Sequence, residues 1–345
     1  MNKTTDFPLP LTKKKLKIYR SSFDLYSDFL YFNNAFHLPA PKEVFKTLRS
    51  HAGKLKLISF QYQGNNKNEN TFVKFCTDKV KKLWKSMYEC KENQLYFFNS
   101  LQELSFFLSG YYKKRINISD LNNSEYTSQN SNFPAIIPFI NPLSGKRAEK
   151  TEILRESILD LSLFFNYIPL NFESLLNNYN SSALVIDLNQ SFGIPFKGYA
   201  LYTLRPTDTE SDFIPNPFML SSIEGMIRFF KKFGPKKLIN LTGRNYYYLH
   251  GKFKTLENRL SAYSVPELDN KYNPFKTEYS NHYESTFIPL SFSNREIYGN
   301  LCSKLDSNRI IYSKNEKEKT IIISPSFYNS FEEITLLLDI FRENL

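Results

Sequence analysis

The stretch Ser182-Ala-Leu-Val-Ile-Asp-Leu-Asn-Gln-Ser-Phe-Gly193 decides the expected fold. An apolar run from Ala183 to Ile186 ends at Asp187, and polar residues then break the pattern. A short apolar run that polar residues end is typical of a strand buried on both faces of a sheet. Ligands of open α/β sheets bind beyond the carboxyl ends of such strands, so Asp187 is a candidate site residue. The alternative is that Asp187 only begins a turn, a common role of aspartate.

The length and composition are those of a globular protein with a substantial core. The chain has 345 residues, 41% of them hydrophobic, and a formal net charge of +11. This length accommodates one large domain and a smaller one. The basic residues are scattered, and their densest clusters, Lys13–Lys15 and Lys79–Lys82, are short. We therefore expect a solvated basic surface and no nucleic-acid partner, although the charge alone leaves that alternative open.

Cysteine and histidine usage indicates neither a metal site nor a disulfide framework. The three cysteines (Cys76, Cys90 and Cys302) lack the required spacing, and the four histidines are scattered. The N-terminus has no apolar signal region, and no apolar run approaches the length of a membrane span. We expect no metal, no membrane partner and a cytoplasmic location.

The order of the apolar runs predicts a mainly parallel sheet with helical crossovers. The expected strands of the large domain are Gln94–Phe98, Ile136–Ile140 and Leu184–Asp187. Its expected helices are one that begins at Pro41, then Thr71–Tyr88, Leu104–Leu108, Glu152–Phe165, Ser222–Phe233 and Lys236–Ser261. The large α/β domain should span residues 21–264, after an irregular N-terminal arm of residues 1–20.

Residues 265–345 should form a small α+β domain. The expected elements are a strand at Thr286–Phe292, a helix at Asn294–Leu305 and a hairpin that pairs Arg309–Tyr312 with Thr320–Ser324. The last helix opens with Ser330-Phe-Glu-Glu333, which is the pattern of a capping box.

Two motifs of this chain resemble those of the class V aminotransferases. Asp187-Leu-Asn-Gln-Ser-Phe-Gly193 is similar to the Asp-x-x-Gln-Ser-x-Gly stretch of that family, which includes cysteine desulfurases and kynureninases. Ile323-Ser-Pro-Ser-Phe-Tyr-Asn329 resembles its C-terminal signature, and the similarity runs in order from about Tyr31 to Phe341. The resemblance implies a fold-type-I pyridoxal-phosphate (PLP) transferase, with a large α/β domain, a small C-terminal α+β domain and a homodimeric assembly.

The resemblance also implies roles for individual side chains. Asp187 would pair with the protonated pyridine nitrogen of PLP, and Gln190 would face its phenolic oxygen. Ser100, between a strand and a helix, would hold the phosphate, unless it only caps the helix. Phe133 would stack on the ring, with Tyr126 as second choice; the alternative for both is that they fill the core.

The chain departs from the family pattern in two places. In the family, the segment after the glycine carries the lysine that forms the Schiff base. Here Gly193-Ile-Pro-Phe196 runs almost directly into the next strand, so we expect that segment to be deleted and only Lys197 to be a catalytic candidate. The arginine that binds the substrate carboxylate in a bidentate pair is replaced by Ile322.

Two functions remain open at this point. The first is a PLP-dependent enzyme that acts on an amino acid or amine, with Lys197 as the aldimine lysine. The second is a catalytically degenerate aminotransferase-fold protein with a binding or scaffolding role. The retained Asp187 and Gln190 favour the first, whereas the missing segment and Ile322 favour the second.

Overall fold

The computed structural model describes residues 9–23, 29–61, 66–113, 136–141, 157–163, 170–206, 213–260, 263–265 and 287–345. Its contacts divide the chain into two compact units. The central unit comprises Ala40–Ile140 and Arg147–Phe233, and the terminal unit comprises Met1–Pro39, Asn141–Lys146 and Gly234–Leu345. The terminal unit thus combines both ends of the chain, whereas the expected domains, 21–264 and 265–345, are continuous. Those domain limits remain a prediction.

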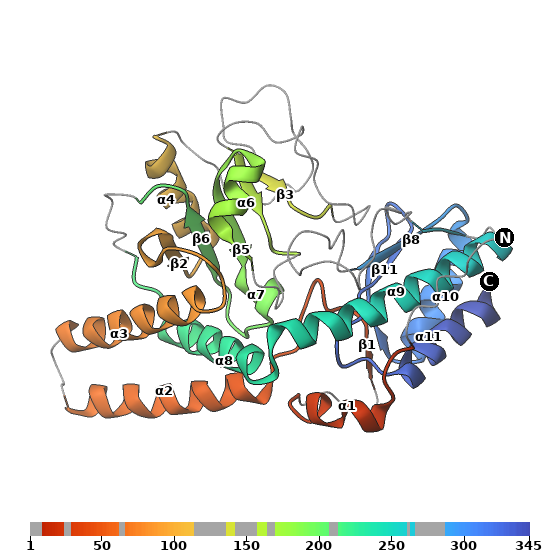
Figure 1. Ribbon diagram of the computed structural model, residues 1–345, viewed down its shortest axis with the longest axis horizontal. Helices are drawn as coiled ribbons and strands as arrows, with labels where there is room; N and C mark the ends of the chain where they lie inside the picture. Colours follow the sequence, from red (N-terminus) through yellow and green to blue (C-terminus); the bar gives the residue numbers. More distant parts are fainter. Residues whose placement is uncertain are drawn as a thin grey trace. The chain divides into compact units, whose positions relative to one another are not determined.

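A five-stranded sheet is the centre of the central unit (Figure 1). Its strands, in spatial order, are β2 (Leu95–Phe98), β6 (Tyr199–Thr203), β5 (Ser181–Asp187), β4 (Ser157–Asp160) and β3 (Ile136–Pro138). Strands β3, β4 and β5 pair in parallel, and β6 is antiparallel to both β5 and β2. Four of these five strands therefore run in one direction, which confirms the mainly parallel α/β sheet expected from the sequence.

Helices cover this sheet. They are α2 (Lys42–Gln61), α3 (Asn66–Lys85), α4 (Leu101–Tyr112), α6 (Phe172–Tyr179), α7 (Leu188–Phe192) and α8 (Pro217–Phe233), with a 3₁₀ turn η1 (Glu92–Gln94) before β2. Helices α2, α3 and α8 lie side by side (Figure 1). Helix α4 packs on the sheet through a cluster that includes Phe98, Leu104, Val185 and Leu201. Because side chains alternate along a strand, residues in step with Val185 face α4.

The terminal unit is built around a second, antiparallel sheet. Its strands are β10 (Ser313–Asn315), β11 (Thr320–Ile323), β8 (Ile288–Phe292) and β7 (Tyr263–Ser264). Its helices are α1 (Lys13–Arg20), α9 (Pro235–Leu260), α10 (Arg295–Ser307) and α11 (Phe331–Asn344), and β1 (Leu30–Tyr31) pairs in parallel with β9 (Ile310–Ile311). The capping box predicted at the start of α11 is present, with Ser330 and Glu333 bonding reciprocally.

Three local predictions are wrong. Residues 13–20 are not irregular but form α1, because Leu16 and Tyr19 give this mostly basic segment a buried face. The expected helix Glu152–Phe165 contains strand β4, since a short apolar run fits a buried strand as well as a helix. The hairpin begins at Ser313 rather than at Arg309, because Ile310 and Ile311 pair with β1 instead.

No helix among the residues that the structure describes is long and apolar enough to cross a membrane.

Candidate functional site

Several predicted site residues lie at one edge of the central sheet. The last residue of β2, Phe98, and the last residue of β5, Asp187, both pair with Tyr199, the first residue of β6. Asp160 ends β4, the parallel neighbour of β5. The carboxyl ends of β2, β4 and β5 and the start of β6 therefore share an edge, where α/β sheets usually bind ligands. Lys197 precedes β6 and belongs to the same edge.

Asp187 and Gln190 lie on one turn, as the sequence motif requires. Asp187 is the N-cap of the short helix α7, and its Oδ1 accepts a hydrogen bond of 3.1 Å from the backbone N–H of Gln190. Both side chains are half-buried. Asp187 therefore does begin a turn, which was the alternative role considered for it. This role occupies one of its two carboxylate oxygens.

Asp160 is a second acid at this edge that the sequence analysis missed. Its Oδ1 accepts hydrogen bonds from Ser162, at 2.8 Å from the backbone N–H and 2.5 Å from the hydroxyl. Burial raises the pKa of Asp160, and the negative charge of Asp187 raises it further, against the opposing effect of the Ser162 hydrogen bonds. The available signal was an acid directly after an apolar run, which the mistaken helix over Glu152–Phe165 concealed.

Tyr199 completes this group of ionisable side chains. It lies opposite Asp187 in the β5–β6 ladder and on the face covered by α4. Burial raises the pKa of the Tyr199 hydroxyl, and the nearby charges of Asp187 and Asp160 raise it further. The edge therefore disfavours additional negative charge.

Ser100 is the N-cap of α4, as its alternative role predicted. Its hydroxyl oxygen accepts a 3.2 Å hydrogen bond from the backbone N–H of Glu103. The carboxylate of Glu103 folds back over the same turn, where it accepts hydrogen bonds from Asn99, at 2.7 Å from the backbone N–H and 3.2 Å from Nδ2. Sequence analysis missed Glu103, although Ser-x-x-Glu at a helix start is a known capping pattern.

Lys197 is exposed in the short connection between α7 and β6. This connection is short: the backbone N–H of Leu188 donates to the carbonyl of Gly198 at 2.9 Å, and Gly198 lies against the side chain of Met219. Strand β5 pairs directly with β6 over Asp187 and the residues before it. The sheet thus continues from the strand that bears Asp187 to the antiparallel strand without another strand between them.

Phe133 and Tyr126, the two candidates for stacking on the cofactor ring, lie outside the described residues. Their roles remain predictions.

Ile322 occupies the middle of β11 in the terminal unit. It is buried and pairs with Pro289 of β8 and Ser313 of β10. Ile321 and Ile323 face the hydrophobic core of this unit, so Ile322 lies on the opposite face of the strand. An isoleucine offers no donor to a carboxylate at this position.

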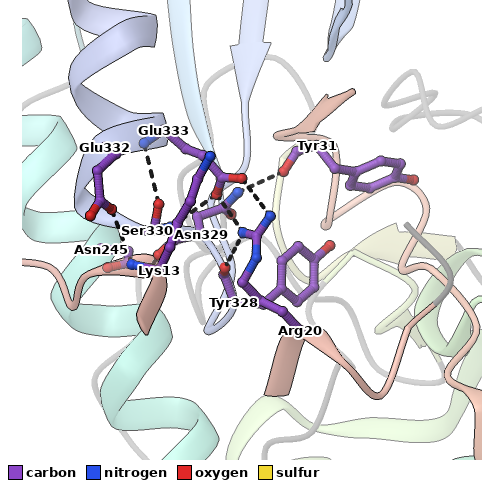
Figure 2. A network of polar contacts seen from close by, with 9 residues as sticks. All are labelled: Lys13, Arg20, Tyr31, Asn245, Tyr328, Asn329, Ser330, Glu332 and Glu333. Carbon is purple, nitrogen blue, oxygen red and sulfur yellow. Dashed lines mark hydrogen bonds and ion pairs between the residues drawn. The ribbon is translucent and has the colours of Figure 1, made fainter. Parts of the chain in front are cut away.

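The C-terminal signature forms a network of polar contacts within the terminal unit (Figure 2). The Asn329 side chain accepts from the backbone N–H of Ser326 and donates to the carbonyl of Tyr31. Asn245 of α9 donates to the carbonyls of Ser326 and Asn329 at 2.7 and 2.8 Å. The signature therefore joins β1, α9 and the start of α11.

The N-terminal asparagines take part in the same unit. The Asn34 side chain donates to the carbonyl of Ser324 at 2.7 Å and accepts from the hydroxyl of Tyr328. Asn33 accepts from the hydroxyl of Ser313. Both asparagines are buried, and their described contacts are structural.

Among the residues that the structure describes, no group of three or more His, Cys, Asp or Glu side chains is arranged to hold a metal ion.

Comparisons with known proteins identify the fold but no close relative. No protein-family model matches the chain, and no curated protein matches it. A cysteine desulfurase from Thermococcus onnurineus NA1, solved in its apo form, is 12% identical and superposes with a TM-score of 0.64 over 97% of this chain and 98% of its own. A C-DES variant with glycine covalently linked to its PLP cofactor is 10% identical, with a TM-score of 0.66 over 93% and 98% of the two chains.

A phosphoserine aminotransferase from Cytophaga hutchinsonii is similar as well, at 12% identity and a TM-score of 0.57 over 92% of this chain and 99% of its own. All three proteins are matched over nearly their whole length. The chain therefore has the fold of the PLP-dependent transferases of fold type I.

Proposed function

We propose that this chain is a divergent, catalytically degenerate relative of the class V aminotransferases, and that it has a binding or scaffolding role. The direct pairing of β5 with β6 carries this proposal. Residues 188–198 form α7 and a tight connection, which leaves no room for a further strand that would present a lysine beside Asp187. The family's covalent chemistry requires a lysine amine that forms the aldimine, and the proposal is that no lysine of this chain takes that role.

The residues at the sheet edge do not fit PLP well. Asp187 and Gln190 lie on one turn, as the resemblance requires, but Asp187 already caps α7. The helix start that would receive the phosphate holds the carboxylate of Glu103. We therefore derive no catalytic step through this cofactor.

Ile322 supports the proposal that the family's way of binding the substrate carboxylate has also been lost. A bidentate arginine is the usual means of holding a carboxylate, and an aliphatic side chain cannot replace its hydrogen bonds. An amino-acid substrate would need another cation. The chain thus differs from a typical family member in the residues for the cofactor and in those for the substrate.

The alternative is a PLP-dependent enzyme that acts on an amino acid or amine through Lys197. Its supporting observation is the position of Lys197 two residues before Tyr199, which pairs with Asp187. In that case the protein would also use Gln190, Ser100 and Phe133 as the resemblance implies.

The visible absorption spectrum of the purified protein with added PLP, before and after borohydride reduction, tests the proposal. We expect no reducible aldimine band and no lysine labelled in peptide maps. A labelled lysine would overturn the proposal and identify the residue. In that event K197A should abolish the label if Lys197 is the site, whereas K82A, a change at an exposed lysine of α3, should not.

We also propose that the protein is a homodimer, because the family's sites are built at a dimer interface. Sedimentation equilibrium measures this directly, and a monomer would contradict it.

A further inference from the structure

The N-terminal turn of α4 has the layout of an anion site. It follows β2 directly and lies at the same sheet edge as Asp187. The first backbone N–H groups of a helix lack partners within the helix, and the helix dipole adds partial positive charge there. A strand followed by a helix start is for these reasons a common seat for phosphate.

In this chain an internal anion holds that position. The Glu103 carboxylate accepts from the backbone N–H and from Nδ2 of Asn99, at 2.7 and 3.2 Å. The backbone N–H of Glu103 in turn donates to the hydroxyl of Ser100. Two backbone N–H groups of this turn, those of Asn99 and Glu103, are therefore already satisfied by groups of the turn itself.

The segment before α8 fixes this arrangement. The Asn99 side chain accepts from the backbone N–H of Asn216 at 2.5 Å and donates to the carbonyl of Ile214 at 3.0 Å. Phe213 packs against the rings of Phe98 and Phe106. Asn99 is thus held from both sides, so its N–H stays directed at the Glu103 carboxylate.

A phosphate group could accept from the Asn99 N–H only if the Glu103 carboxylate left it. Even a displaced Glu103 would remain attached to the first turn, and two anions within a few ångströms repel each other strongly outside bulk water. Asp160 and Asp187 add negative charge at the same edge.

We propose that Glu103 acts as a built-in anion that excludes phosphate, and hence phosphorylated ligands such as PLP, from the start of α4. This goes beyond the proposed loss of the aldimine, because a protein without the lysine could still hold the cofactor by its phosphate. It also restricts any ligand of this sheet edge to one without a phosphate at this position.

The variant E103Q tests the proposal, because glutamine keeps an acceptor for the Asn99 N–H but removes the charge. Calorimetric titration with inorganic phosphate at low ionic strength, supported by ³¹P line widths, measures binding; equilibrium dialysis with PLP is the second probe. We expect phosphate to bind E103Q at least about tenfold more tightly than the wild type, as relief of like-charge repulsion predicts. The matched control is E173Q, which removes a first-turn acid of α6 that pairs with Lys91, and it should bind phosphate no better than the wild type.

A folded E103Q that binds phosphate no more tightly than the wild type would overturn the proposal. If E103Q does not fold, as judged by circular dichroism, E103A serves the same test. These outcomes are independent of the borohydride experiment: a labelled lysine refutes the proposed function, whereas phosphate titration decides the role of Glu103.

Discussion

Asp160 and Asp187 are joined through a single hydroxyl group. The Ser162 hydroxyl donates to Oδ1 of Asp160 at 2.5 Å and accepts from the backbone N–H of Asp187 at 2.8 Å. Ser191 of α7 adds a bond of 2.7 Å to the Ser162 carbonyl. The ends of two parallel strands and the helix that follows are thus held together, and the two acids are kept near each other.

Replacing Asp160 by asparagine should stabilise the protein at neutral pH. Because the pKa of Asp160 is raised above its usual value of 3.8, the folded state disfavours the ionised form. The wild type therefore loses stability as pH rises from 3.8 through the folded-state pKa. D160N keeps an acceptor for Ser162 and carries no charge, so its advantage over the wild type should grow from pH 4 to pH 7. Urea unfolding across this range measures it.

The control for this prediction is D78N, at an exposed acid of α3. It should change the free energy of unfolding by less than about 0.5 kcal/mol, as is usual for surface substitutions. A D160N protein that is less stable than the wild type at pH 7 would show that the Asp160 charge is well accommodated.

A buried ionic cluster makes the central unit sensitive to acid. Glu224 of α8 pairs with Lys79 of α3 at 2.8 Å and with Arg228 at 2.7 Å, and its other oxygen lies 3.5 Å from Nε2 of His51. The ring Nδ1 of His51 contacts the hydroxyl of Ser221. Burial lowers the pKa of His51, assisted by Lys79, Lys54 and Arg228 and opposed by Glu224.

The sign of the pH dependence follows. Below pH 6.5, the unfolded chain binds a proton that folded His51 does not, so the free energy of unfolding falls as pH falls. The slope from this group is at most about 1.4 kcal/mol per pH unit. H51N, which retains a partner for Ser221, should flatten the profile between pH 6.5 and 5, whereas H37Q, at an exposed histidine, should leave it unchanged. An H51N profile as steep as the wild type's would assign the acid sensitivity to other groups.

Gly225 permits the close approach of α8 to α2. A Cβ at this position would lie 2.6 Å from Cα of Val44 and 3.0 Å from the Glu43 carbonyl oxygen, and backbone cannot move aside as a flexible side chain does. We expect G225A to cost about 1–3 kcal/mol of stability through overpacking. The same change at Gly53, an open position in α2, should instead stabilise by up to about 1 kcal/mol because alanine is the better helix former. Chemical denaturation measures the free energy of unfolding of both variants, and equal changes would refute the close contact.

Arg20 binds Glu333 through Nη1 and Nη2, the two terminal guanidinium nitrogens, each at 2.8 Å, and Nη1 also donates to the Tyr328 carbonyl (Figure 2). Glu333 is only 4% exposed, so R20M would leave its carboxylate buried with Ser330 as the remaining donor of this network. We expect a loss of about 2–3 kcal/mol.

The exposed pair of Arg342 with Asp339 on α11 provides the matched control. R342M should cost less than about 0.5 kcal/mol, since exposed ion pairs contribute little. Urea unfolding followed by circular dichroism compares the two variants, and similar losses would mean that the Arg20 contact is no stronger than a surface pair.

Elements with an unambiguous local pattern could be predicted from the sequence. The continuous apolar run before Asp187, the long helix after Pro235 and the Ser330–Glu333 capping box each rest on interactions within one short segment. They predicted β5, α9 and the start of α11 with small errors at the ends, whereas β4 was taken for part of a helix.

The missed features depend on distant parts of the chain. Helix α1 is held by α11, and β9 pairs with β1 rather than with its sequence neighbour. At the site, the resemblance drew attention to Ser100 and Asp187. Glu103 had a local signal in the Ser-x-x-Glu pattern, whereas Asp160 was hidden because its strand was taken for part of a helix.

The terminal unit is assembled from the beginning and the end of the chain, which imposes an order on synthesis. Chains emerge from the ribosome N-terminus first, so the central unit has all of its residues before the antiparallel sheet of the terminal unit exists. Arg20 precedes Glu333 by 313 residues, a separation that takes roughly 15 to 60 s to translate. During that interval the first helix is without its partner, and the opening of the chain is therefore among the last parts to reach its native contacts.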